Sequence, residues 1–240
     1  MNSPASAPFP ILGVDTSSHA GSLALLHGNT LLEERSLAAT GRRHARTLVA
    51  EVQALLRSHS VAPRDIGLLA VSAGPGSFTG LRVGVVFAKT FGYLTGTPLV
   101  AVDTFAIIAA NAPADVTRLW VLEDAQRGAL FAGHYTRTPE GHFTATGTTR
   151  IVPLEELAPL IEPADAVIGP GVKRLPDDLR TARRCLEGDL ALPRGEHVAR
   201  IGLRQWAAGD RVTPFEFVPH YIRRSAAEEV AEKKALEAAR

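Results

Sequence analysis

The stretch GPGSFTGLRVG, residues 74–84, carries four glycines and a proline in eleven residues and lies between two apolar segments. Before it, residues 66–74 (IGLLAVSAG) are almost entirely apolar, as in a strand at the centre of a sheet. After it, residues 81–96 (LRVGVVFAKTFGYLTG) have the spacing of a helix. A strand, a glycine loop and a helix in this order present free N–H groups and the positive end of a helix dipole.

The residues after the loop separate two possible uses of it. The loop has neither the Gly-Lys-Ser/Thr ending of a Walker A loop nor the pattern GxGxxG. Ser77 or Thr79 is expected to cap the helix. Gly80, Gly84 and Ala88 then recur every four residues, and such a small-residue stripe lets another backbone approach closely. Because most of the stripe lies away from the helix N-terminus, it favours a packing interface over a phosphate site.

Working outward, residues 11–36 predict three antiparallel strands with Gly28 and Asn29 at the second turn. The first strand ends in Asp-Thr-Ser-Ser, where Asp15 and Ser17 offer a carboxylate and a hydroxyl at a tight bend. Together with Gly74 and Gly76, they are the candidate contacts for an anion or a nucleotide. The same turn also suits a purely structural role in ending the strand.

The rest of the chain predicts a mixed α/β protein. A helix is expected over residues 43–59, a strand over 97–103 and a short helix over 104–111. The pattern then restarts, with three strands over 118–124, 129–137 and 142–152. A short helix near 153–160, a strand over 165–169 and a helix over 197–208 complete this half. Residues 223–240 are rich in alanine and charge and are expected to form an exposed helical tail.

Charge, cysteine count and the lengths of the apolar stretches argue against several classes of function. The 26 basic and 25 acidic residues give a net charge of +1, which is a poor electrostatic match for direct binding of nucleic acid. Cys185 is the single cysteine and indicates a reducing compartment. The first residues do not resemble a signal peptide, and no apolar stretch is long enough for a membrane span. A cytoplasmic location is therefore expected.

The usual catalytic motifs are absent from the sequence. No two of the eight histidines are four residues apart, and neither HExxH nor GxSxG occurs. Glu123 and Asp124 are adjacent and are expected on opposite faces of a strand, so they are not an acid/base pair. Neither a catalytic residue nor a metal ligand is predicted on this chain.

Several segments in order resemble the bacterial TsaB (YeaZ) family: ILGVDTSS, RRHARTLV, AVSAGPGSFTGLRVG and TPLVAVDTFA, then VLEDAQRGALFAGHY and PHYIRR. The resemblance implies a two-domain actin-like (ASKHA, RNase H-like) fold with mixed sheets flanked by helices. It places an N-terminal subdomain at residues 11–105, a C-terminal subdomain at 106–222 and the charged tail at 223–240. The implied role is a non-catalytic subunit in making threonylcarbamoyladenosine on tRNA.

The resemblance also implies partners. The family's first two helices, here residues 43–59 and 80–95, pack against the catalytic paralogue TsaD in a heterodimer. His44, Arg46, Gly80, Arg82, Gly84 and Ala88 are the residues expected at that surface. The ATPase TsaE joins the assembly, tRNA contact is indirect, and the isolated chain is expected to be able to pair with itself. No cofactor is expected on this chain, whereas ATP or ADP and a metal ion are expected in the complex.

The chain departs from the family at a few positions. Where TsaD has its metal-binding histidines, this chain has Thr104 and Ile108, neither of which replaces a metal ligand. His44-Ala45-Arg46 stands where the family has His-Ser-Glu, which reverses a charge, and Gln126 interrupts the family's Asp-Ala-Arg. Two alternatives from other classes stay open: a stand-alone ATP-dependent small-molecule kinase and a metallopeptidase.

Overall fold

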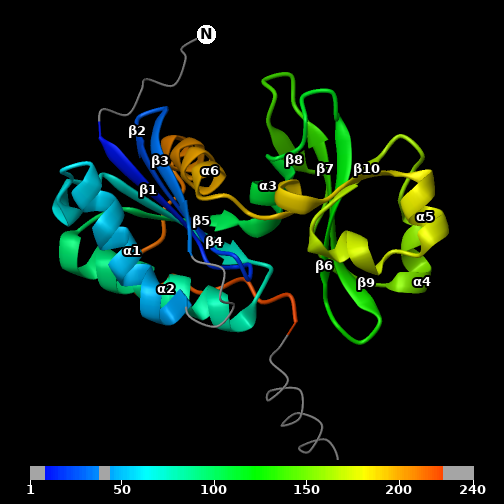
Figure 1. Cartoon of the computed structure of the whole chain (residues 1–240), viewed down its shortest axis with the longest axis horizontal. Coiled ribbons are helices and arrows are strands. Elements are labelled where there is room, and N and C mark those ends of the chain that lie inside the picture. The colour runs from blue at the N-terminus through cyan, green and yellow to red at the C-terminus, as the bar shows by residue number, and fades with distance from the viewer. Residues whose placement is uncertain (1–8, 38–43, 224–240) are drawn as a thin grey trace, which may run out of the picture.

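In the computed structural model, two lobes lie side by side, each built around its own β-sheet (Figure 1). The structure describes residues 9–37 and 44–223, and of residues 44–46 the helical backbone alone. Of the tail expected over 223–240, all but Arg223 lies outside the described residues. Among those described, the helices are all too short or too polar to cross a membrane.

The first lobe is built on a five-stranded mixed sheet. In spatial order its strands are β3 (Thr30–Ser36), β2 (Ser22–His27), β1 (Pro10–Asp15), β4 (Leu68–Gly74) and β5 (Leu99–Asp103). Strand β2 runs antiparallel to both of its neighbours, whereas β1, β4 and β5 are parallel. Val14 of β1 pairs with Val71 of β4 in parallel register, which brings the two predicted turns to the same sheet edge.

Helices cover both faces of this sheet. Helices α1 (His44–Ser58) and α2 (Phe78–Thr95) pack on one face, and α3 (Thr104–Ala109) and α6 (Gly195–Ala208) pack on the other (Figure 1). The seven residues of β4 are all buried, because a central strand covered on both faces has no solvent side. This explains the unbroken apolar run that precedes the glycine loop.

The second lobe has a six-stranded sheet, with apolar clusters on both faces. It contains β6 (Arg118–Asp124), β7 (Ala129–Arg137), β8 (Phe143–Ala145), β9 (Arg150–Pro153), β10 (Ala166–Ile168) and β11 (Arg184–Leu186), together with the short helices α4 (Leu154–Leu157) and α5 (Asp177–Ala182). The single strand expected over 142–152 is two strands, and each pairs with β7. Exposed residues around Gly147 separate them.

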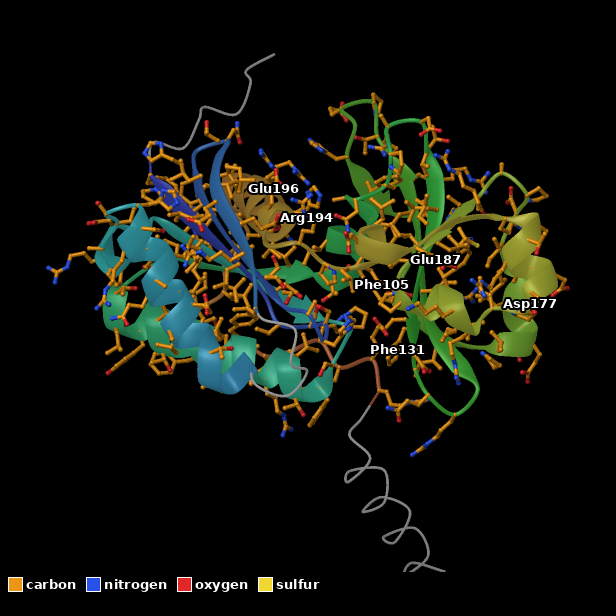
Figure 2. The ribbon with its side chains drawn as sticks, in the orientation of Figure 1. Phe105, Phe131, Asp177, Glu187, Arg194 and Glu196 are labelled. Carbon is orange, nitrogen blue, oxygen red and sulfur yellow. The ribbon has the colours of Figure 1, made fainter. Side chains whose placement is uncertain are left out.

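The predicted architecture of two mixed sheets flanked by helices is confirmed. The division at residue 105 stays a prediction, but α6 falls in the range expected for the second subdomain and packs on the first sheet. The carbonyl oxygen of Gly195 approaches β1 so closely that a Cβ at Gly13 would lie 2.2 Å from it. Phe105 is buried where α3 meets the second lobe (Figure 2).

Residues 210–223, here called the C-terminal strap, run back along the first lobe toward the second. Val212 donates its N–H to the carbonyl of Leu99 at 3.1 Å, and His220 donates to Ala73 at 2.7 Å. At its end, the guanidinium of Arg223 donates to the carbonyl of Ala125 in the second lobe. The strap therefore joins the two lobes at the mouth of the space between them.

Candidate functional site

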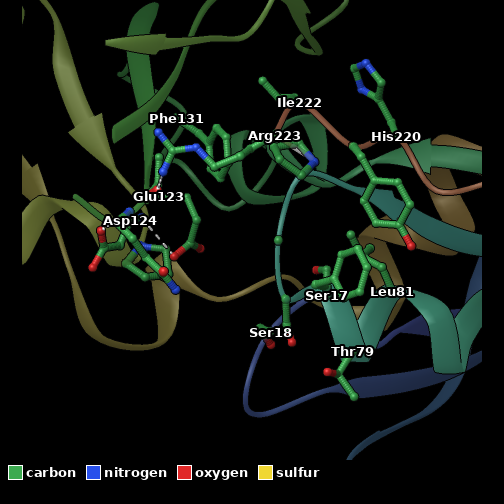
Figure 3. Close-up of a pocket in the computed structure, with 18 of the residues that line it drawn as sticks. Ser17, Ser18, Thr79, Leu81, Glu123, Asp124, Phe131, His220, Ile222 and Arg223 are labelled. Carbon is green, nitrogen blue, oxygen red and sulfur yellow. Dashed lines mark hydrogen bonds between the residues drawn. The ribbon is translucent and has the colours of Figure 1, made fainter. Parts of the chain in front are cut away.

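Two regions of the surface bring sequence-predicted residues together. The first is a cleft of about 580 Å³ between the lobes, and the second is an apolar groove between α1 and α2. The cleft is bounded by the Asp-Thr-Ser-Ser turn and the glycine loop on one side and by the end of β6 on the other (Figure 3). His220, Tyr221, Ile222 and Arg223 of the strap complete its wall.

The Asp15 carboxylate is fully buried and is bound by its own turn. One oxygen accepts from the N–H and hydroxyl of Ser17 at 3.1 and 2.5 Å, and the other accepts from the hydroxyl of Ser18 at 3.3 Å. Burial raises the pKa of Asp15, and the serine donors oppose that rise. Asp15 does not line the cleft, so its observed contacts are those of a structural turn.

Hydrogen-bonding groups of the glycine loop also find their partners within the chain. Ser77 donates its N–H to the carbonyl of Ser17 at 2.7 Å, and its hydroxyl accepts from the N–H of Gly80 at 3.2 Å. Ser77 is thus the cap of α2, one of the two residues predicted for that role. Of the four predicted anion contacts, Ser17 and Gly76 line the cleft, whereas Asp15 and Gly74 do not.

The opposite wall of the cleft carries two carboxyl groups whose side chains were expected on opposite faces of a strand. Glu123 and Asp124 both line the cleft because β6 ends there and the chain turns (Figure 3). Burial raises the pKa of Glu123 to about 7, and the adjacent charge of Asp124 adds to the rise. Arg127 and Arg223 line the same space, so the cleft has mixed charge.

The α1/α2 groove has about 630 Å³ of space and an apolar lining that includes Phe87 and Phe91. Its rim holds three large apolar side chains that are mostly exposed: Val49 at 65%, Val86 at 63% and Leu94 at 74%. Such a gathering of exposed apolar groups on one face marks a contact surface. The sequence analysis predicted the two helices but did not single out these exposed residues. On α2, the groove-lining positions 83, 86, 90 and 94 recur with helical spacing, and this pattern is visible in the sequence.

The small-residue stripe of α2 faces the sheet of the chain's own first lobe and not the α1/α2 groove. Gly80, Gly84 and Ala88 are buried against the chain's own first lobe, where a Cβ at Gly80 would lie 2.0 Å from the carbonyl oxygen of Thr16. A Cβ at Gly84 would lie 2.4 Å from the Thr16 hydroxyl oxygen. Their expected place on the partner-facing surface is therefore corrected: these residues let α2 sit close to its own sheet.

Of the other predicted interface residues, only Arg82 has a described side chain. Arg82 is exposed and lines the groove, where its guanidinium lies 3.9 Å from the centre of the Phe78 ring. Its Nε donates to the hydroxyl of Tyr221 at 3.1 Å. His44 and Arg46 belong to α1, but their side chains lie outside the described part of the structure.

The positions matched to the TsaD histidines serve the core. Thr104 is buried, and its hydroxyl accepts from the N–H of Gly74 at 3.2 Å. Ile108 is buried among apolar residues of the second lobe. Across residues 9–37 and 44–223, no three His, Cys, Asp or Glu side chains are grouped as metal ligands.

Comparison with known proteins gives concordant matches. The family model for tRNA N6-adenosine threonylcarbamoyltransferase, TsaD, matches residues 36–162. The chain is 34% identical over 125 residues to the tRNA threonylcarbamoyladenosine biosynthesis protein TsaB of Bacillus subtilis, which covers 52% of this chain and 54% of that protein. With the TsaB protein of Escherichia coli it shares 27% identity over 223 residues, covering 90% and 96% of the two.

The fold comparison agrees with these matches. The solved structure of YeaZ from Pseudomonas aeruginosa has a TM-score of 0.77 and 29% sequence identity, covering 89% of this chain and 99% of that one. Agreement over nearly the whole of both chains includes both lobes.

Proposed function

We propose, from the premise that this chain belongs to the TsaB (YeaZ) family, that it is a non-catalytic subunit in the biosynthesis of threonylcarbamoyladenosine on tRNA. The reaction it assists is transfer of a threonylcarbamoyl group to the N6 of the adenosine beside the anticodon. The catalytic subunit is the paralogue TsaD, which this chain binds and activates. The single cysteine fits a reducing compartment, and we place the function in the cytoplasm.

The α1/α2 groove is the observation that carries this proposal. Val49, Val86 and Leu94 stay exposed although the sheet beneath them has a complete core. Burying them against a partner helix removes apolar surface from water, at about 25 cal/mol for each Å². The groove also lies on the two helices that the family resemblance implies for the heterodimer.

The cleft supports an accessory role better than an independent kinase. The N–H and the hydroxyl of Ser17 both donate to Asp15, and the N–H of Ser77 donates to the carbonyl of Ser17, which leaves fewer donors for a phosphate. The carboxyl groups of Glu123 and Asp124 face the same space as Arg127 and Arg223, so the cleft has no clear excess of positive charge to attract a polyanion. We therefore assign the nucleotide and the metal ion of the reaction to the assembled complex with TsaD and TsaE, and tRNA contact mainly to TsaD.

The metallopeptidase alternative has less support. Thr104 and Ile108 contribute a hydroxyl and an apolar side chain to the protein core, and both are already in contact with other parts of the chain. A metallopeptidase needs a ligand set with an open position. A measured stoichiometric metal content in the purified chain would favour that alternative.

The decisive experiment compares threonylcarbamoylation of tRNA by the matching TsaD with and without this chain. The carrier adenylate, TsaE and ATP are present in both reactions, and a third reaction contains this chain without TsaD. We expect modification only when both proteins are present. Equal modification by TsaD with and without this chain would refute the accessory role.

A further inference from the structure

We propose that the partner surface continues from the α1/α2 groove onto the C-terminal strap, where Phe215 acts as an anchor for the same protein partner. This inference rests on the proposed function and adds a third element to its interface. Phe215 and Tyr93 are together called the strap patch. They contact each other with ring centres 6.1 Å apart and planes at 80°.

The strap holds its residues in fixed places. Phe217 is 1% exposed and packs in the core beneath α1 and α2, while Phe215, two residues earlier, is 79% exposed. Backbone hydrogen bonds from Val212 and His220 fix the segment on either side of Phe217. The carbonyl of Phe215 also accepts from the ammonium of Lys89 at 3.4 Å. Phe215 is thus presented to solvent on an ordered backbone, which lowers the entropy lost on binding.

The strap patch is continuous with the groove through α2. Tyr93 is 69% exposed and lies seven residues after Val86, so both are on the outward side of the helix. Val86 lines the groove together with Thr90 and Leu94, which come after it at intervals of four. The apolar surface therefore runs from α1 across α2 to Phe215 on the strap. A partner helix seated in the groove would have the strap patch at its edge.

The charges around this surface define the partner's chemistry. Helix α2 carries Arg82 and Lys89 and no acidic residue. A complementary partner would present an apolar helix face, a pocket for an aromatic ring and acidic residues opposite these two cations. This describes a protein surface, and we assign it to the TsaD-type subunit that occupies the groove.

The test is a titration of the full-length chain with its matching TsaD by isothermal calorimetry. We expect Phe215→Ala to raise Kd by about tenfold or more, since buried aromatic anchors dominate interface energetics. Tyr93→Ala is expected to act in the same direction. Leu190→Ala, which also truncates a partly exposed apolar side chain but on a different part of the surface, should change Kd by less than about twofold. Val86→Asp, in the groove itself, should abolish binding.

These variants separate the inference from the function on which it rests. If Val86→Asp abolishes binding while Phe215→Ala and Tyr93→Ala leave Kd unchanged, the strap patch is not part of the interface, and the inference fails while the proposed function survives. If the unmodified chain does not bind TsaD, the proposed function itself fails. If Phe215→Ala weakens only self-association in analytical ultracentrifugation, the patch belongs to a homodimer and the inference is wrong.

Discussion

Gly80 of α2 lies against the backbone of Thr16, and the two residues are joined by a hydrogen bond from the Thr16 hydroxyl to the Gly80 carbonyl at 2.8 Å. The close approach places the glycine loop beside the Asp-Thr-Ser-Ser turn, although the two residues are 64 positions apart in the chain. A side chain at Gly80 has no space, because the nearest atom is a backbone oxygen that cannot rotate away.

Gly80→Ala is therefore expected to destabilise the protein by about 1–3 kcal/mol, the usual range for overpacking a core. The measurement is urea unfolding followed by circular dichroism. Gly147→Ala is the matched control, since a Cβ at Gly147 meets nothing within 4 Å. Equal stability of the Gly80 variant and the control would show that α2 can shift away from Thr16 without loss.

Phe215 and Phe217 should respond very differently to truncation. Phe217→Ala removes a ring from the core and is expected to lower the free energy of unfolding by about 3–5 kcal/mol. Phe215→Ala removes an exposed ring and should change it by about 0.5 kcal/mol or less. Thermal and urea unfolding of the isolated chain measure both. A large destabilisation by Phe215→Ala would indicate that this residue serves the fold.

Tyr135 connects the lobes through Asp103, because its hydroxyl donates to the carboxylate at the end of β5 at 2.8 Å. Burial raises the pKa of Asp103, and the donors from Ala106 and Tyr135 oppose that rise. Tyr135→Phe leaves the buried carboxylate with one donor fewer, and we expect a loss of about 1–3 kcal/mol at pH 7.

The pH dependence of this loss has a definite sign. The Tyr135 hydroxyl stabilises the ionised form of Asp103, so its removal should matter more at pH 7 than at pH 4, where more of Asp103 is protonated. Urea unfolding at the two pH values measures the difference. Tyr221→Phe, which removes a more exposed hydroxyl bonded to Arg82, should cost about 0.5 kcal/mol or less. A loss from Tyr135→Phe that is larger at pH 4 would contradict this account.

Glu123 should make stability fall as pH rises. Its pKa in the folded protein is about 7, above the ordinary value of 4.5, because burial disfavours the charged form. The folded state therefore binds the proton more tightly, and ionisation between pH 4.5 and 7 removes stability. Glu123→Gln keeps the oxygen that accepts from the Asp124 N–H and should be more stable than the parent at pH 8.

Melting temperatures from pH 5 to pH 8 test this prediction. The advantage of Glu123→Gln should be smallest at pH 5 and should grow toward pH 8. Glu156→Gln changes an exposed carboxyl in α4 and controls for the loss of one surface charge. An advantage that does not change with pH would mean that Glu123 ionises as freely in the folded protein as in the unfolded chain.

Local patterns in the sequence were sufficient to locate most elements. The unbroken apolar run of β4, the shorter apolar run of β6, the partial alternation of β7 and the helical spacing in α1 and α2 are all short-range patterns. The glycine loop and its Ser77 cap were also predictable, because turn and cap preferences act over a few residues. The strand expected over 142–152 was wrong, since pairing of both its ends with β7 depends on the loop between them.

Tertiary structure alone decided which surface each pattern serves. A stripe such as Gly80, Gly84 and Ala88 permits close packing but does not specify whether the neighbouring backbone is the chain's own sheet or a partner. The return of α6 to the first sheet and the outward position of Phe215 depend on contacts between residues far apart in sequence. The raised pKa of Glu123 also depends on the assembled fold, because burial of its side chain on the wall of the cleft disfavours the charged form. Sequence periodicity reports which side of an element is apolar, and only the assembled fold determines what that side contacts.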